Sequence, residues 1–227
     1  MTVSIFRPDA HVESSSFDGY IRNSECAPAQ PWGGMQSATC GNCANDSGTS
    51  MNIGYSAAGG GCCNRYARID RTYITFDTSS IPCGNVISSA TLGVVAKAVV
   101  NTFSGGDSMI LVTNTVSSTT GLTVADFNNV GTANQATASI PLACITANSC
   151  AYTTFTLNST GIGNITKDGA TKFALRSLKD STDTEPTWGA DNQERVTMET
   201  ADGCLSCKEP ILTVTHAPAF VPRAVVF

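Results

Sequence analysis

The clearest alternation of apolar and polar positions in the chain centres on Ile74 and Phe76, which alternate with a tyrosine and a threonine. This two-residue period predicts a strand that is buried on one face. The turn formers Asp77-Thr-Ser-Ser follow, and Pro82 then stops ladder pairing. A second strand is predicted to begin near residue 89 and to run to residue 100. The pattern is therefore strand, short polar corner, strand.

Similar apolar stretches recur along the whole chain, separated by Gly, Ser, Asn and Thr. No helix longer than about ten residues is expected. Besides the two strands above, the expected elements are strands within 1–22, a strand at 108–113, a strand near 153, a turn of helix at 124–127, a short helix near 159–167, a strand at 173–176, and closing strands at 195–199 and 210–216. Many short strands between turn signals indicate an all-β protein. We predict a jelly-roll-like antiparallel β-sandwich with long disulfide-stapled loops, formed by residues 1–216 as a single domain.

The segment 23–66 is rich in Gly, Asn, Ser and Cys and predicts a long, loop-rich insertion. The chain has ten cysteines, an even number that is high for a cytosolic domain. Most lie in polar loops, which favours disulfides, and Cys144 and Cys150 are close enough in sequence to close a hairpin loop. A four-thiolate zinc site from the C-x-x-C pairs at 40/43 and 204/207 is one alternative, and free thiols are the other. The predicted disulfide cysteines are Cys26, Cys40, Cys43, Cys62, Cys63, Cys83, Cys144, Cys150, Cys204 and Cys207.

The segment from Arg68 to Pro82, followed by Ile87-Ser-Ser-Ala-Thr-Leu92, resembles the motif R-x-x-x-x-F-D-T-S-x-I-P…I-x-S-A-x-L of the DNRLRE family of carbohydrate-binding β-sandwich modules. Further similar segments follow in the family's order and cover nearly the whole chain. They are Phe6-Arg-Pro-Asp9, Phe17-Asp-Gly-Tyr20, Phe155-Thr-Leu-Asn158 with Ile162 and Ile165, Trp188 with Glu194, and Pro210-Ile-Leu-Thr-Val-Thr215. The resemblance implies a sandwich that binds carbohydrate rather than cleaving it, of a type found in phage and environmental sequences.

Composition narrows the range of partners. The formal charge is −5, only 14% of residues are charged, and there is no basic run, so a nucleic-acid partner is not expected. No apolar stretch approaches the ~18 residues of a membrane span. The segment 1–7 lacks the basic and apolar regions of a signal peptide. We therefore expect an extracellular or virion-surface location, reached either after removal of a signal or on cell lysis.

The acidic loop 180–194 is the main candidate for ligand chemistry, because it combines carboxylates with a tryptophan. A tryptophan face can stack on a sugar ring while carboxylates accept hydrogen bonds from hydroxyl groups. The candidate carbohydrate-binding residues are Trp188, Asp191 and Glu194, with Trp32 and Tyr55 from the other long loop. Carboxylate oxygens also suit Ca²⁺, so the acidic loop predicts either no cofactor or a bound Ca²⁺ with the candidate ligands Asp180 and Asp183. A solvated loop and a carboxylate pair for glycoside hydrolysis are the alternatives.

Catalytic motifs are not found in the sequence. The chain has two histidines and no G-x-S-x-G, so a Ser-His-Asp triad is not expected. It also has no phosphate-binding G-x-x-x-x-G-K and no H-E-x-x-H zinc motif. We therefore predict a non-enzymatic protein without catalytic residues.

The segment 217–227 predicts an extended apolar tail, because it contains two prolines and a single charge. Its apolar side chains either pack on their own domain or dock on a neighbouring subunit. The residues assigned to assembly are Phe220, Val225, Val226 and Phe227. The leading functional hypothesis is a virion or surface-assembly structural protein of phage type, such as a decoration, fibre or attachment subunit, that self-associates or joins other surface proteins and touches polysaccharide. A secreted carbohydrate-binding module and an extracellular filament subunit are the alternatives.

Overall fold

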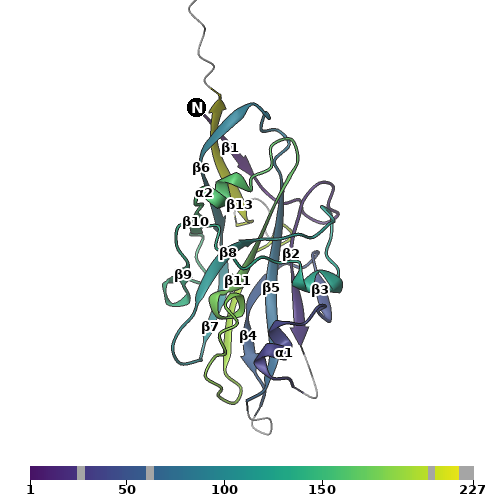
Figure 1. Cartoon of the computed structure of the whole chain (residues 1–227), viewed down its shortest axis with the longest axis vertical. Coiled ribbons are helices and arrows are strands. Elements are labelled where there is room, and N and C mark those ends of the chain that lie inside the picture. Colours follow the sequence, from purple (N-terminus) through teal and green to yellow (C-terminus); the bar gives the residue numbers. More distant parts are fainter. Residues whose placement is uncertain (25–28, 60–63, 204–207, 220–227) are drawn as a thin grey trace, which may run out of the picture.

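The computed structural model describes residues 1–24, 29–59, 64–203 and 208–219, and confirms an all-β protein built from antiparallel sheets (Figure 1). The strands are β1 (Thr2–Phe6), β2 (Phe17–Ser24), β3 (Cys43–Asn45), β4 (Met51–Ala57), β5 (Tyr66–Asp77), β6 (Asn85–Val94), β7 (Ala96–Asn101), β8 (Ser108–Thr113), β9 (Ile140–Pro141), β10 (Thr153–Thr156), β11 (Ala170–Ser177), β12 (Gln193–Met198) and β13 (Ile211–Pro218). The helical segments are α1 (Trp32–Gln36), η1 (Val124–Asn128), η2 (Leu142–Cys144), α2 (Ser159–Gly163) and α3 (Leu178–Ser181).

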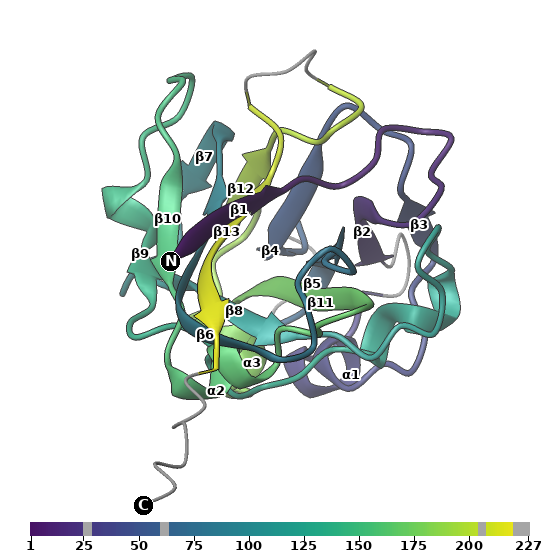
Figure 2. The same cartoon turned by 90° about the horizontal axis from the view of Figure 1, so that it is seen from above.

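The strands form two sheets of unequal size. The smaller sheet has four strands in the order β1-β13-β6-β10, and Figures 1 and 2 show β1, β13 and β6 together at one side of the larger sheet. The larger sheet runs in the order β7-β12-β4-β5-β11-β8-β9, with β2 and β3 attached through β5. Along one edge β5 pairs with β2, and along its other edge it pairs first with β4 and then with β11. The larger sheet therefore branches at β5, because β4 and β11 share one edge of this strand, and the sheet is curled.

Strand β5 is buried on both faces, which corrects the half-buried strand expected from its alternation. Ile74 and Phe76 face the sandwich core between the two sheets, and Tyr73 and Ile69 face a second core on the other side. We call this second core the flank core; it is covered by short elements, including Trp32 of α1, and by loop residues. Alternate residues of β5 thus face two different apolar cores, rather than one core and the solvent.

The segment 23–66 is more regular than a loop-rich insertion. It contains α1, β3 and β4, and β4 is an internal strand of the larger sheet, paired with β5 and β12. Within β4, Gly54 has a φ of 123°, which is unfavourable for other residues. A Cβ at this position would also collide with the carbonyl oxygen of Glu194. The closing strand β13 extends to Pro218, two residues further than expected.

Disulfide stapling is not found in the described part of the chain. Its cysteines are free thiols, so the predicted Cys144–Cys150 bridge is wrong. The free cysteines are Cys40, Cys43, Cys83, Cys144 and Cys150. The other predicted disulfide residues, Cys26, Cys62, Cys63, Cys204 and Cys207, lie outside the described residues, as do the predicted assembly residues Phe220, Val225, Val226 and Phe227. No helix within the described ranges has the length and apolarity needed to cross a membrane.

Candidate functional site

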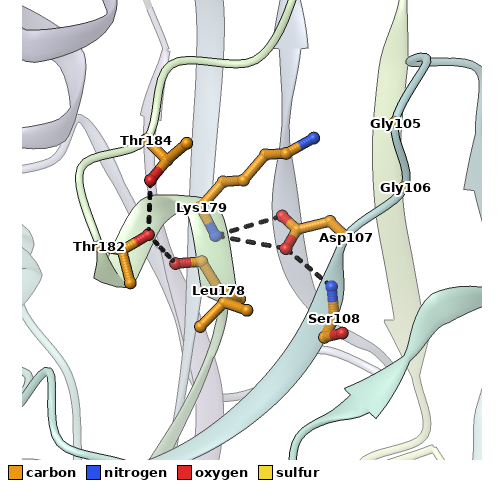
Figure 3. Close-up of a pocket in the computed structure, with 8 residues that line it drawn as sticks. All are labelled: Gly105, Gly106, Asp107, Ser108, Leu178, Lys179, Thr182 and Thr184. Atoms are coloured by element: carbon orange, nitrogen blue, oxygen red, sulfur yellow. Dashed lines mark hydrogen bonds between the residues drawn. The ribbon is translucent and has the colours of Figure 1, made fainter.

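A pocket of about 450 Å³ lies between the β7–β8 turn and the segment that contains α3. One wall is the run Gly105–Ser108, and the other is formed by Leu178, Lys179, Thr182 and Thr184 (Figure 3). Gly105 and Gly106 have φ values of 88° and 60°, and this left-handed backbone makes the tight turn that brings Asp107 to face α3. The Ser177 side chain caps α3 by accepting a hydrogen bond from the Asp180 amide, which fixes the opposite wall.

Asp107 joins the two walls of the pocket. Its carboxylate accepts hydrogen bonds from the Ser108 amide at 2.7 Å and from the Lys179 amide at 3.3 and 3.4 Å. The Tyr55 hydroxyl donates to the same carboxylate at 3.3 Å. Figure 3 shows the Lys179 side chain extending from α3 past Asp107. The pocket therefore presents one carboxylate and one lysine amine, close to two threonine hydroxyls.

Glu194 lies behind Asp107 and away from solvent. It is the direct partner of Tyr55 across β12 and β4, and it is 1% exposed. Both of its carboxyl oxygens are buried and receive no fixed donor from the described residues. Burial, reinforced by the neighbouring Asp107 carboxylate, raises the pKa of Glu194 to about 8. At neutral pH the protonated form of Glu194 is therefore favoured.

The aromatic residues predicted to bind sugar lie mainly in the flank core. Trp32 and Tyr55 are each 2% exposed and meet edge to face, with ring centroids 5.1 Å apart. Neither ring has a free face on which a sugar could stack. Trp188 is partly buried against the same core, and its indole Nε1 donates to the Arg65 carbonyl at 3.0 Å. Asp191 is exposed on a turn beside Ala58.

The candidate Ca²⁺ ligands do not come together. Asp180 is 1% exposed, and its carboxylate is occupied by Arg71 and Arg176 at 2.8–2.9 Å. Burial alone would raise the pKa of Asp180, but these two guanidinium groups lower it to about 2. Asp183 is exposed, on a turn with a φ of 49°. A carboxylate already neutralised by two arginines is a poor cation ligand, so the assignment of Asp180 to Ca²⁺ is corrected. No cluster of three or more potential metal-binding side chains is found in the described ranges.

Sequence reasoning missed Asp107 and Lys179, the two charged residues of the pocket. A signal for Asp107 was present, because Gly105-Gly106-Asp107 is a turn sequence between two apolar strands. Turn carboxylates at strand ends are common, however, and only the fold shows that α3 lies opposite. Of the predicted sugar-binding residues, Tyr55 and Glu194 support this pocket from behind rather than lining it.

Comparison with models of known protein families gives no match, and comparison with curated protein sequences gives none either. A functional assignment therefore depends on the geometry and chemistry of this pocket and of the surrounding surface.

Proposed function

We propose that this protein is a non-enzymatic extracellular or virion-surface protein, with a jelly-roll-like sandwich, that binds a hydroxyl-rich ligand such as a glycan in the pocket beside Asp107. The observation that carries the proposal is the pocket itself, with a carboxylate, a lysine and threonine hydroxyls around about 450 Å³ of open space. One positive and one negative group leave the pocket without a strong net charge. Such a lining offers donors and acceptors to a neutral polyhydroxylated molecule.

The arrangement of the two carboxyl groups supports binding over glycoside hydrolysis. Hydrolysing enzymes hold their carboxyl groups about 5 Å or more apart so that the sugar or a water fits between them. Glu194 is instead enclosed, at 1% exposure, and does not line the pocket beside Asp107. The buried acid thus has no access to a ligand, while the Asp107 carboxylate is held in the pocket wall by its own amide and hydroxyl donors.

A second candidate function, assembly on a virion or cell surface or into a filament, is favoured by the outer face of the smaller sheet. Val3 and Ile5 of β1 are 61% and 54% exposed, and Val86 of β6 is 58% exposed. Their partners across the sheet are Thr215, Thr213 and Ala217, so this face carries no charge along these rows. A β-branched, uncharged face next to an edge strand is suited to contact with another protein.

The glycan proposal is tested by screening the full chain on a glycan array and measuring retention of the hits by affinity electrophoresis. Lys179→Ala and Thr184→Ala should each lose retention, while their melting temperatures stay close to that of the parent. Thr187→Ala, an exposed threonine on the same loop outside the pocket, is the matched control and should bind normally. Unchanged retention of both pocket variants would place the ligand elsewhere, and a chain that retains no glycan would reject the ligand class.

The assembly candidate is tested by light scattering. The double variant Val3→Thr/Ile5→Thr keeps β-branched residues but should lower the mass of any oligomer or block incorporation into a particle. Val12→Thr, which changes a residue that is 83% exposed but outside the strands, is the control and should have no effect. A parent chain that is monomeric at all concentrations would remove this second function.

A further inference from the structure

Three arginines surround one aspartate on the face of the larger sheet opposite Glu194. Arg195 on β12 pairs with Gly54 on β4, Gly54 pairs with Asp70 on β5, and Asp70 pairs with Arg22 on β2. These four residues therefore form one row across four strands. Arg68 precedes Asp70 by two positions on β5 and so points to the same face. Because Gly54 has no side chain, the long Arg195 side chain has room to lie across β4 toward Asp70.

Positive charge exceeds negative charge in this cluster. Arg22 Nε donates to Asp70 Oδ1 at 2.9 Å, and Arg68 Nε donates to Asp70 Oδ2 at 2.5 Å, so one carboxylate already serves two guanidinium groups. Arg195 adds a third, and its Nε is buried without a hydrogen-bond acceptor among the described residues. Burial and the charge of Arg68 lower the pKa of Arg195, Asp70 opposes this, and Arg22 adds to the lowering.

The other pair of buried arginines shows that this fold can satisfy such groups when their role is structural. Arg71 and Arg176 also share a single carboxylate, that of Asp180, but their remaining N–H groups donate to carbonyls. The acceptors are the carbonyl oxygens of Phe127, Gln36, Gly131 and Asp180. For Arg195, by contrast, the buried Nε has no acceptor in the described part of the chain. The cluster around Asp70 thus lacks an acceptor for a buried N–H group, whereas the cluster around Asp180 has its acceptors.

We propose that Arg22, Arg68 and Arg195 form a binding site for an oxyanion, such as a sulfate or phosphate group. A tetrahedral oxyanion supplies several acceptor oxygens and the negative charge that the cluster lacks, and guanidinium groups bind such ions through paired N–H donors. The site is open to solvent, because the side chains of Arg22 and Arg68 are 26% and 19% exposed. It is separate from the pocket beside Asp107, since alternate residues of β12 point to opposite faces and Glu194 and Arg195 are neighbours.

The same chemistry serves a free inorganic anion and a sulfate ester on a polymer, so the test uses both. The full chain is titrated with sodium sulfate by calorimetry and thermal shift, against sodium chloride at equal ionic strength. Sulfate should give a saturable rise in melting temperature, beyond the general salt effect that it has on any protein. Affinity electrophoresis in dextran sulfate, with neutral dextran as the blank and inorganic sulfate as the competitor, then shows whether a polymer-bound ester reaches the same site.

Arg195→Gln should weaken sulfate binding by at least about tenfold, the loss expected for one hydrogen bond to a charged group. Arg195→Lys keeps the charge and should bind with intermediate strength. Arg7→Gln is the matched control, because Arg7 is a surface arginine with its own carboxylate partner, Glu209, outside the cluster. A response to sulfate that is linear and unsaturable, or that is equal in the parent and in folded Arg195→Gln, would overturn the proposal.

Discussion

The Asp180 carboxylate is held by the guanidinium of Arg71 although the two residues lie 109 positions apart in the chain. The two hydrogen bonds measure 2.9 and 2.8 Å, and Arg176 adds a third at 2.8 Å. Arg71 also lies over the Phe127 ring, 4.1 Å from its centroid. These buried ion pairs therefore link β5, β11 and the start of the acidic loop.

Asp180→Asn is therefore expected to destabilise the protein by about 3–5 kcal/mol at pH 7, because it leaves two arginines without a buried counter-charge. Since the folded pKa of Asp180 is lowered to about 2, its stabilisation is present above the ordinary value of 3.8 and is lost as pH falls through about 2. Urea denaturation of the variant and parent at several pH values measures both effects. Asp183→Asn, on the exposed turn, is the control and should change stability by less than about 0.5 kcal/mol.

The elements were predictable from the sequence wherever strands alternate or end in clear turns. Residues 173–176 lie in β11, and the expected helical turns appear as η1 and α2. What the sequence could not show is which strands are buried on both sides, because that depends on the flank core and on loops distant in the chain. The missed strand β4 is the clearest case, since its apolar side chains are divided between the two cores and the sequence around it is rich in Gly, Asn and Ser.

The candidate site was predicted only in part, and for a related reason. An acidic loop with a tryptophan suggests exposure, but Asp180 and Glu194 are both 1% exposed. Asp180 is drawn inward by two arginines, and Glu194 by its place opposite Tyr55 in the sheet. The pairs Arg71–Asp180 and Tyr55–Glu194 each join residues more than a hundred positions apart, and no local pattern in the chain indicates them.

Trp188→Ala is expected to lower stability by about 1–3 kcal/mol, between the cost of a solvent-exposed ring and that of a fully buried one. The reason is that Trp188 is partly buried against the flank core and its Nε1 is bonded to the Arg65 carbonyl. Trp188→Phe retains much of the packing and should cost about 1 kcal/mol through the lost hydrogen bond. Thermal unfolding of both variants provides the measurement. An unchanged melting temperature in Trp188→Ala would instead favour the predicted role as a sugar platform.

Cys83 is expected to react with iodoacetamide more slowly than the other exposed thiols at the same pH. Its Sγ donates to Asp168 Oδ2 at 3.0 Å, and this hydrogen bond and the carboxylate charge raise the pKa of Cys83. Cys144 and Cys150 are exposed without such a partner in the described residues and serve as internal references. Peptide mapping after timed labelling of the native protein measures all three. Asp168→Asn should speed labelling of Cys83 alone; a failure of Cys144 and Cys150 to label without reductant would contradict the free thiols.

The pH dependence of stability should reveal the raised pKa of the buried Glu194 carboxyl group. The pKa of Glu194 is raised from 4.5 to about 8 in the folded protein, so between these values the folded state holds a proton that the unfolded state has released. Stability therefore falls as pH rises through this window. Glu194→Gln mimics the protonated acid, because its amide can donate to Asp107 without titrating. We expect the variant to match the parent near pH 5 and to exceed its stability by roughly 4 kcal/mol at pH 9, at about 1.4 kcal/mol for each pH unit of the window.

The comparison between variant and parent is needed because Asp18 titrates in the same range. Burial raises the pKa of Asp18 to about 8, the Ala201 amide opposes this, and the nearby Asp202 and Glu13 add to it. The decline in the parent's free energy of unfolding toward pH 9 thus includes contributions from both Asp18 and Glu194. Only the difference between the two proteins isolates the contribution of Glu194. Urea denaturation at pH 5, 7 and 9 gives that difference. A gap between the proteins that stays constant with pH, or that widens toward pH 5, would show that Glu194 is ionised in the folded state.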